Sequence, residues 1–114
     1  MPATTVDITM YWRPRCGFCM TLQHQLDALE VPYRKVNIWE EPDGAAFVRQ
    51  ANDGNELVPT VVVGTATLSN PSPGQVLAAV HAQDPGTDLP PPPEPGRIAQ
   101  GAKRLNTVWP WTSG

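Results

Sequence analysis

Two cysteines, Cys16 and Cys19, are the residues of this 114-residue chain whose type and spacing most clearly predict chemistry. A thiolate attacks disulfides, and the partial positive charge at the start of a helix stabilises a thiolate placed there. Apolar residues follow the pair at helical spacing, so Cys16 is expected at the N-terminal end of a helix and Cys19 one turn further on. Arg13 and Arg15 add positive charge, and Asp7 is the only acidic residue among the first 26. The pattern predicts Cys16 as an attacking thiolate and Cys19 as a buried resolving thiol.

Other uses of the cysteine pair remain open at the level of the sequence. Two cysteines at this spacing also form half of a zinc site, but His24 lies five residues past Cys19 and on another side of the expected helix. The pair could also be inert core, or it could hold an iron–sulfur cluster shared between two chains. We favour redox chemistry without a bound metal, because packing does not explain a glycine inside the pair and a helix directly after it.

The apolar pattern predicts an α/β unit with the element order β-α-β-α-β-β-α. Strands are expected over residues 6–12, 33–38, 58–63 and 66–68, and helices over 16–30, over 41–51 and from Pro73 onward. A strand, helix, strand order favours a parallel pair with a right-handed crossover, and Gly64-Thr65 predicts a hairpin. The simplest sheet with this order is four-stranded and mixed, with helices on both faces.

The same spacing predicts which side of each helix is buried. On the first helix the buried stripe consists of Cys19, Leu22, Leu26 and Leu29. Gln23 is expected on the opposite, exposed side. On the second helix the inner side consists of Ala46, Phe47 and Ala51. Ser72 is expected to cap the third helix, with Pro73 as its first residue.

A second chemical signal is Val58-Pro59, about forty residues after the cysteines. A proline at the head of a strand that otherwise resembles a central strand needs a reason, because proline cannot donate to the ladder. If the Val58–Pro59 bond is cis, the turn can bring backbone N–H and C=O groups beside the cysteines, where they could pair with a bound thiol or peptide. The alternative is a proline at a strand edge without a role.

Proline content divides the chain. Of its 14 prolines, seven lie within residues 1–84 and six within 85–95. A stretch this rich in proline should be extended, and a unit of about 84 residues can bury one modest core. The sequence therefore predicts a redox domain over 1–84, a proline-rich linker over 85–96 and a tail of unassigned structure over 97–114. We favour a disordered tail. The alternative is a docking segment, either Pro90 to Pro93 for an aromatic groove or Trp109-Pro110-Trp111 for a partner or a membrane surface.

Charge and hydropathy exclude several classes of partner. Residues 1–84 contain five Lys/Arg and nine Asp/Glu, a net charge of −4, which argues against binding a nucleic-acid backbone. The chain has no run of 18 apolar residues, and its N-terminus lacks the basic and apolar segments of a secretory leader. We expect a cytoplasmic monomer that neither spans a membrane nor binds nucleic acid.

Three motifs together resemble a known family. They are Y-W-R-P-R-C-G-F-C at 11–19, G-N-E-L-V-P-T-V at 54–61 and T-L-S-N-P-S at 67–72. Residues 6–82 resemble the glutaredoxin-like branch of the thioredoxin fold, and within it the mycoredoxins, which act on mycothiol mixed disulfides. The resemblance implies a thioredoxin-like fold, a cis Val58–Pro59 bond and Cys16 as the nucleophile. It also implies a groove lined by Phe18, Leu57, Val58, Ser69 and Asn70.

Departures from the glutathione-dependent members bear on the choice of thiol. Those members usually carry Gly-Gly and then Ser/Cys-x-Asp where this chain has Ser69-Asn70-Pro71-Ser72. Their aspartate receives the glutathione amino group, so its absence argues against glutathione. Arg13 matches a basic position that pairs with a glutathione carboxylate, which mycothiol lacks, and therefore favours glutathione mildly. Arg15 replaces the tryptophan common in mycoredoxins and bears on the choice of partner. The Trp-Ser-Gly-Phe-like stretch of redoxins that reduce ribonucleotide reductase is missing.

We therefore expect a thiol–disulfide oxidoreductase that removes a low-molecular-weight thiol, mycothiol, from modified protein cysteines. It would bind no cofactor and would use the thiol as a co-substrate, with S-thiolated or disulfide-bonded proteins as partners. The alternative enzyme is a protein-disulfide reductase recharged by a thioredoxin reductase. An alternative outside the enzymes is a binding module that is either redox-inactive or carries an iron–sulfur cluster.

Overall fold

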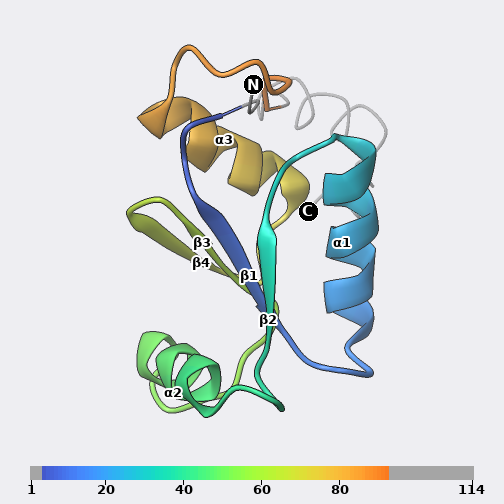
Figure 1. Ribbon diagram of the computed structural model, residues 1–114, viewed down its shortest axis with the longest axis vertical. Coiled ribbons are helices and arrows are strands. Elements are labelled where there is room, and N and C mark those ends of the chain that lie inside the picture. The colour runs from blue at the N-terminus through green and yellow to red at the C-terminus, as the bar shows by residue number, and fades with distance from the viewer. Residues whose placement is uncertain (1–3, 93–114) are drawn as a thin grey trace, which may run out of the picture.

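The computed structural model describes residues 4–92, which form a four-stranded sheet with helices on both faces (Figure 1). The strand order is β2-β1-β3-β4. In chain order the strands are β1 (Ile8–Trp12), β2 (Arg34–Asn37), β3 (Thr60–Val63) and β4 (Ala66–Ser69). β1 pairs with β2 in parallel and with β3 antiparallel, and β3 and β4 form an antiparallel hairpin. The thioredoxin-like fold expected from the sequence is confirmed.

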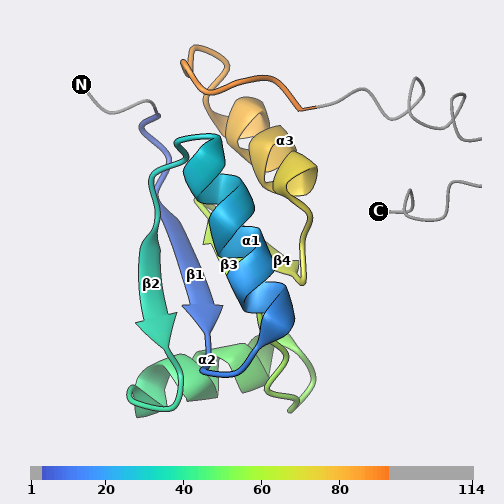
Figure 2. The same ribbon diagram turned by 90° about the vertical axis from the view of Figure 1, so that its right-hand side faces the viewer.

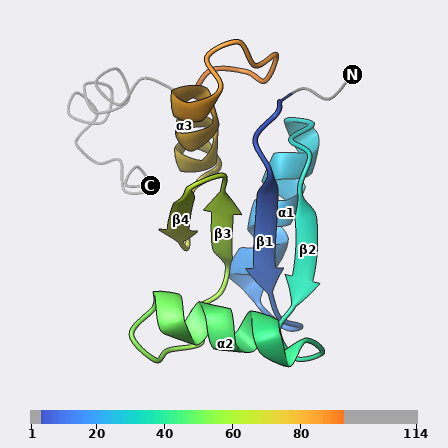
Figure 3. The same cartoon turned by 60° about the vertical axis from the view of Figure 1, so that its left-hand side comes forward.

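The three helices form the outer layers. They are α1 (Gly17–Ala28), α2 (Pro42–Ala51) and α3 (Pro73–Gln83). α1 lies on one face of the sheet with α3 beside it, whereas α2 crosses the other face near one end of the strands (Figure 2). Figure 3 shows that α2 runs across the end where β1 and β2 finish. Since β1 leads into α1 at this end, the cysteines lie at the same edge of the sheet as α2.

The buried apolar residues form two clusters. In the larger cluster, Met10 and Val61 of the sheet pack with Leu26 of α1 and Val76 of α3. The smaller cluster lies toward α2 and consists of Cys16, Cys19, Ile38, Ala45, Val48 and Val58. Both cysteines therefore belong to the cluster that joins the start of α1 to α2 and to the loop before β3.

The buried side of α2 differs from the expected one. Gly44, Ala45 and Val48 are buried, whereas Ala46 and Ala51 are exposed. The cause is close packing at Gly44, where an added Cβ would lie 2.7 Å from Val36 Cγ1. Because the small residues of α2 face the sheet, Phe47 moves to the margin. It is half-buried and stacks on Tyr11, with ring centroids 4.9 Å apart.

Gln23 also differs from the expectation, because it is buried with only 8% of its surface exposed. It lies four residues after Cys19, on the same face of α1, and so widens the buried face formed by Cys19, Leu22 and Leu26. Its Nε2 has no hydrogen-bond partner among the described residues. The apolar pattern assigned Gln23 to the exposed side because a polar residue carries no sign of burial.

The packed part of the chain extends beyond residue 84, where the linker was expected to begin. A turn in which Thr87 N–H donates to Asp84 O at 3.0 Å brings Leu89 into the larger cluster, where it is 5% exposed. His81 Nε2 lies 3.2 Å from the carbonyl oxygen of Leu89 and 2.9 Å from that of Pro90. One leucine among prolines is thus enough to hold this segment on α3. The remainder of the expected linker, from residue 93, and the tail over 97–114 lie outside the described residues.

Among the described residues no helix is both long enough and apolar enough to cross a membrane.

Candidate active site

Cys16 occupies the cap position of α1. β1 ends at Trp12, a turn follows, and Cys16 adopts extended backbone angles immediately before the helix. Its Sγ accepts a hydrogen bond from Cys19 N–H at 3.1 Å. The first N–H groups of a helix have no partner within the helix, and Ser, Thr, Asp or Asn usually supplies one. Here the Cys16 sulfur is the capping acceptor. The Cys19 N–H that it satisfies therefore points at a potential thiolate.

Cys16 and Cys19 are joined as a disulfide, with their Cα atoms 5.2 Å apart. Cys19 is completely buried, whereas Cys16 retains 5% of its surface exposed. An attacking or attacked sulfur needs access from solvent. Of the two cysteines, Cys16 is therefore the one that a substrate in solution can approach.

The loop before β3 lies against the cysteines. The Val58–Pro59 bond is cis, as the sequence predicted. Val58 packs in the same cluster as both cysteines, and its carbonyl oxygen lies 3.9 Å from Cys16 Sγ. The ladder of β3 begins only at Thr60, so the backbone of Val58 is outside the sheet. The two chemical signals of the sequence thus come together in space.

The other residues expected at the site differ in their contacts and exposure. Asn70 N–H donates to Pro59 O at 2.7 Å, which holds the end of the β3–β4 hairpin beside the cis proline. Phe18 and Leu57 present apolar surface to solvent, being 71% and 41% exposed. Arg13 is half-buried, and its Nη1 donates to Pro14 O at 3.4 Å. Ser69, at the end of β4, faces a neighbouring depression.

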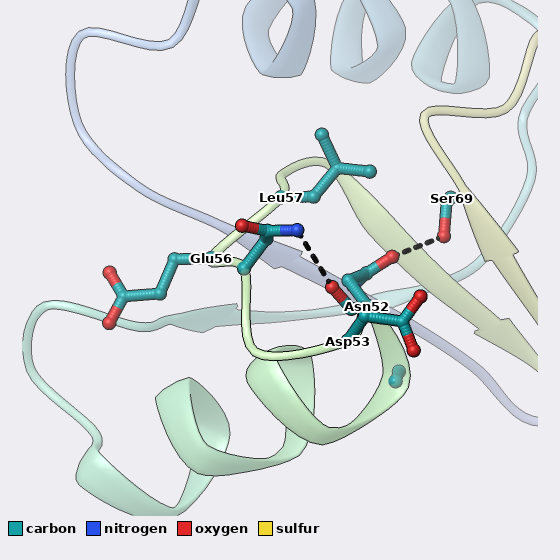
Figure 4. A pocket seen from close by; sticks show the side chains of 7 residues that line it. Asn52, Asp53, Glu56, Leu57 and Ser69 are labelled. Atoms are coloured by element: carbon teal, nitrogen blue, oxygen red, sulfur yellow. Dashed lines mark hydrogen bonds between the residues drawn. The ribbon is translucent and has the colours of Figure 1, made fainter.

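That depression lies between the end of α2, the loop before β3 and the end of β4 (Figure 4). Its lining residues are Ala51, Asn52, Asp53, Asn55, Glu56, Leu57 and Ser69. It shares Leu57 and Ser69 with the expected groove, but it does not include Phe18, Val58 or Asn70. The depression therefore overlaps the predicted groove at two residues and otherwise lies at the end of α2.

Asn52 organises this region, although its sequence context indicates only the end of a helix. Its Nδ2 donates to Val48 O at 2.8 Å and to Thr60 Oγ1 at 3.2 Å, and its Oδ1 accepts from Ser69 Oγ at 2.6 Å. Thr60 Oγ1 in turn donates to Leu57 O at 2.6 Å. One amide thus connects α2, the cis-proline loop and β4. An Asn-Asp-Gly sequence after a helix signals a turn, but it does not identify long-range partners.

Charge is divided across the site. Arg13 and Arg15 lie in the turn before Cys16, and the first turn of α1 contains no acidic residue. Asp53 and Glu56 line the depression on the other side, and Glu56 forms an ion pair with Arg49 at 2.6 Å. Within residues 4–92 no group of three or more His, Cys, Asp or Glu side chains could hold a metal ion.

A thioredoxin-like sheet with a Cys-x-x-Cys pair at the start of α1 and a cis proline beside it defines a class, the thiol–disulfide oxidoreductases of this fold.

Comparisons with known proteins place the chain within this class. A family model described as Glutaredoxin matches residues 8–66. The chain is 39% identical over 75 residues to a protein of Mycobacterium tuberculosis named as a glutaredoxin, covering 65% of this chain and 89% of that protein. It is 31% identical over 77 residues to Mycoredoxin 1 of Corynebacterium glutamicum, covering 67% and 95%. The chain belongs to the glutaredoxin family, and it is a thiol–disulfide oxidoreductase that resembles the mycoredoxins.

Solved structures support the fold. The glutaredoxin-like NrdH-redoxin from Escherichia coli superimposes with a TM-score of 0.55 at 23% identity, covering 61% of this chain and 90% of that one. A complex of buckwheat glutaredoxin with glutathione gives a TM-score of 0.50 at 16% identity, covering 94% and 86%. At these identities the likeness concerns the fold alone.

Proposed function

We propose that this protein removes mycothiol from S-thiolated protein cysteines. The observation that carries the choice of thiol is the segment beside the cis proline. Asn70 N–H bonds to Pro59 O, which holds Ser69 and Asn70 beside the cis-proline loop, where we expect the bound thiol to extend. Both side chains are neutral, and neither offers a carboxylate to the amino group of glutathione. Mycothiol has no free amino group and no carboxylate, so it requires no charged partner in this segment.

The charge of the neighbouring depression supports the same choice. Asp53 gives it a negative charge, whereas the charge of Glu56 is paired with that of the nearby Arg49. A ligand with carboxylates would meet like charge there, whereas a neutral, hydroxyl-rich ligand would meet the amide and hydroxyl groups of Asn55 and Ser69. Repulsion between like charges lowers the affinity of a ligand with carboxylates and does not act on a neutral ligand, so it contributes to selectivity.

The reaction uses two mycothiol molecules: one is already bound in the mixed disulfide, and one free molecule is consumed. The Cys16 thiolate attacks the mycothiol sulfur of the mixed disulfide, and the protein cysteine leaves as a thiolate that takes up a proton. A second mycothiol then attacks the mycothiol bound to Cys16, which releases the mycothiol disulfide and restores the Cys16 thiolate. The N–H of Cys19, which points at Cys16 Sγ, stabilises the charge on that sulfur in both thiolate states.

Cys19 offers a second route for the last step. Its thiolate would attack Cys16 Sγ, expel mycothiol and form the disulfide observed in the structure. Reduction of the Cys16–Cys19 disulfide back to the dithiol then requires two electrons, which two thiols or a disulfide reductase would supply. Phe18 and Leu57 would contact the substrate through their exposed surfaces, the backbone of Val58 would pair with it, and Arg13 would contribute positive charge.

A paired substrate measurement tests the choice of thiol. One peptide carrying a single cysteine is prepared as its mycothiol and its glutathione mixed disulfide, and each is reduced with the matching free thiol. We expect kcat/KM to be at least about tenfold higher for the mycothiol pair, because the amino group of glutathione finds no carboxylate in the segment beside the cis proline. Equal values would contradict the choice of mycothiol. Turnover with NADPH and a thioredoxin reductase, but with neither thiol, would favour the protein-disulfide reductase instead.

A further inference from the structure

Arg15 has an unusual backbone conformation for its residue type. It lies immediately before Cys16 with a φ of 66°, in the left-handed region. Residues with a Cβ seldom adopt this region, and the exceptions are mostly Asn and Asp. Of the four described non-glycine residues with positive φ, Asp53 and Asn70 belong to those tolerant types, whereas Arg15 and Glu30, which follows α1, do not. The conformation turns the chain into the cap of α1, and a glycine or asparagine would adopt it at lower cost.

The guanidinium of Arg15 is also unpaired within the described part of the chain. It is exposed and forms no hydrogen bond or ion pair with any residue of 4–92. The three other arginines in this range all have a partner. Arg13 donates to Pro14 O, Arg34 donates to Thr9 Oγ1 at 3.3 Å, and Arg49 pairs with Glu56. The five N–H donors of Arg15 are thus available to a molecule that approaches Cys16.

The surroundings of Arg15 suit a protein partner. No acidic residue in the first turn of α1 compensates its charge. Phe18, on the far side of Cys16 in the sequence, and Leu57, in the cis-proline loop, add exposed apolar surface. A partner that reaches Cys16 therefore meets apolar contacts and one unpaired positive charge. Exposed aromatic side chains and arginine are the residue types that dominate protein interfaces.

We infer that the turn before Cys16 and the exposed side chains of Phe18 and Leu57 form a docking surface for the thiolated protein. On this surface Arg15 pairs with an Asp or Glu side chain close to the target cysteine. The inference rests on the proposed function for the identity of the disulfide. Since mycothiol carries no carboxylate, the anion must belong to the protein. A guanidinium binds a carboxylate through two parallel N–H donors, so the contact selects position as well as charge.

The test is a single-turnover measurement on two substrates. Two peptides differ only in Glu or Gln beside their cysteine, and each is prepared as its mycothiol mixed disulfide. Prereduced protein is mixed with excess peptide, and release of the peptide thiol is followed as Cys16 takes up mycothiol. The variants are Arg15→Asn, which removes the charge but tolerates a positive φ, and Arg34→Gln, which removes one charge from β2.

We expect the wild type to react roughly two- to fivefold faster with the Glu peptide, as an exposed ion pair allows, and the difference to shrink at high salt. Arg15→Asn should lose this preference and Arg34→Gln should keep it. Equal rates of the wild type on both peptides, or a preference that survives Arg15→Asn, would overturn the inference while leaving the proposed function intact. Failure of the wild type to react with either peptide would instead overturn the proposed function, and the inference with it.

Discussion

Cys16 combines a structural and a chemical role in one atom. Its Sγ accepts the N–H of Cys19 and so caps α1, and the same atom faces Val58 of the cis-proline loop. A cap works best when the acceptor carries charge, and the dipole of the helix favours negative charge at this end. The contact that begins the helix therefore also stabilises the thiolate that the reaction needs.

Asn52 is the residue whose loss should most disturb the site without touching the cysteines. Asn52→Ala would remove its hydrogen bonds with Val48, Thr60 and Ser69. We expect the free energy of unfolding to fall by about 1–3 kcal/mol, because partly buried partners lose their hydrogen bonds. Urea denaturation followed by circular dichroism measures this loss. Asn55→Ala, which removes one exposed hydrogen bond, is the matched control and should change stability by less than about 0.5 kcal/mol. Equal losses in the two variants would contradict the role of Asn52.

Among individual residues, the sequence predicted those whose types are chemically distinctive. Cys16, Cys19 and Pro59 were identified because their spacing or position breaks an ordinary pattern, and the cis bond was implied by the family resemblance. Asn52 and Gln23 were missed. Each acts through neighbours distant in the chain or through burial, and neither property is encoded by residue type or local periodicity.

Helices and strands were predicted with the right type and order, and their ends depend on partners. β3 begins at Thr60 rather than Val58, because Pro59 has no N–H and its carbonyl accepts from Asn70. The start of α3 was predictable, since Ser72 forms a capping box with Gln75 that residue types alone announce. The buried side of α2 was not predictable, because it depends on how closely the helix approaches β2.

Gly44 allows this close approach, and its replacement tests it. In Gly44→Ala the new Cβ would lie 2.7 Å from Val36 Cγ1, so the helix or the strand must shift. Overpacking costs about 1–3 kcal/mol, more than the roughly 1 kcal/mol that alanine gains over glycine in a helix. We expect a net loss of up to about 2 kcal/mol and a lower melting temperature. Gly17→Ala, whose Cβ would meet nothing within 4 Å, is the control and should not lower stability. A stabilised Gly44→Ala variant would refute the proposed packing.

Two contacts join the ends of the described chain to the body of the molecule. At one end Asp84 accepts hydrogen bonds from Thr4 Oγ1 at 2.8 Å and from Thr5 N–H at 3.1 Å. At the other end Leu89 is buried in the larger cluster. Composition suggested a boundary at residue 84 because prolines crowd the segment after it. Proline content says nothing about a single leucine, and the boundary therefore differs from the structure.

Leu89→Ala tests whether this segment is part of the folded unit. Loss of a buried leucine side chain typically costs 2–5 kcal/mol, and we expect about 2–3 here because the segment can partly collapse. Thermal and urea unfolding measure the change. Leu57→Ala, which truncates a leucine that is 41% exposed, should cost much less. If both variants unfold like the wild type, residues 85–90 do not contribute to the core.

The contact of Asp84 predicts a pH dependence. The hydrogen bonds from Thr4 and Thr5 lower the pKa of the Asp84 carboxyl below its ordinary value of 3.8. A lowered pKa in the folded state means that the carboxylate stabilises the fold above about pH 4 and that this contribution disappears as the pH falls through the folded-state pKa. Asp84→Asn should therefore lower the melting temperature at pH 7 and approach the wild type near pH 2. A constant difference between the two proteins from pH 7 to pH 2 would contradict this assignment.

In the proposed reaction Cys16, and not Cys19, attacks the mixed disulfide. The most direct test is intact-mass spectrometry after reduced protein meets a mycothiol mixed-disulfide peptide, with any adduct located by proteolysis. The account predicts that Cys19→Ser gains one mycothiol on Cys16 and that Cys16→Ser gains none. An adduct on Cys19 in Cys16→Ser, or release of the peptide thiol by that variant at the wild-type rate, would contradict it.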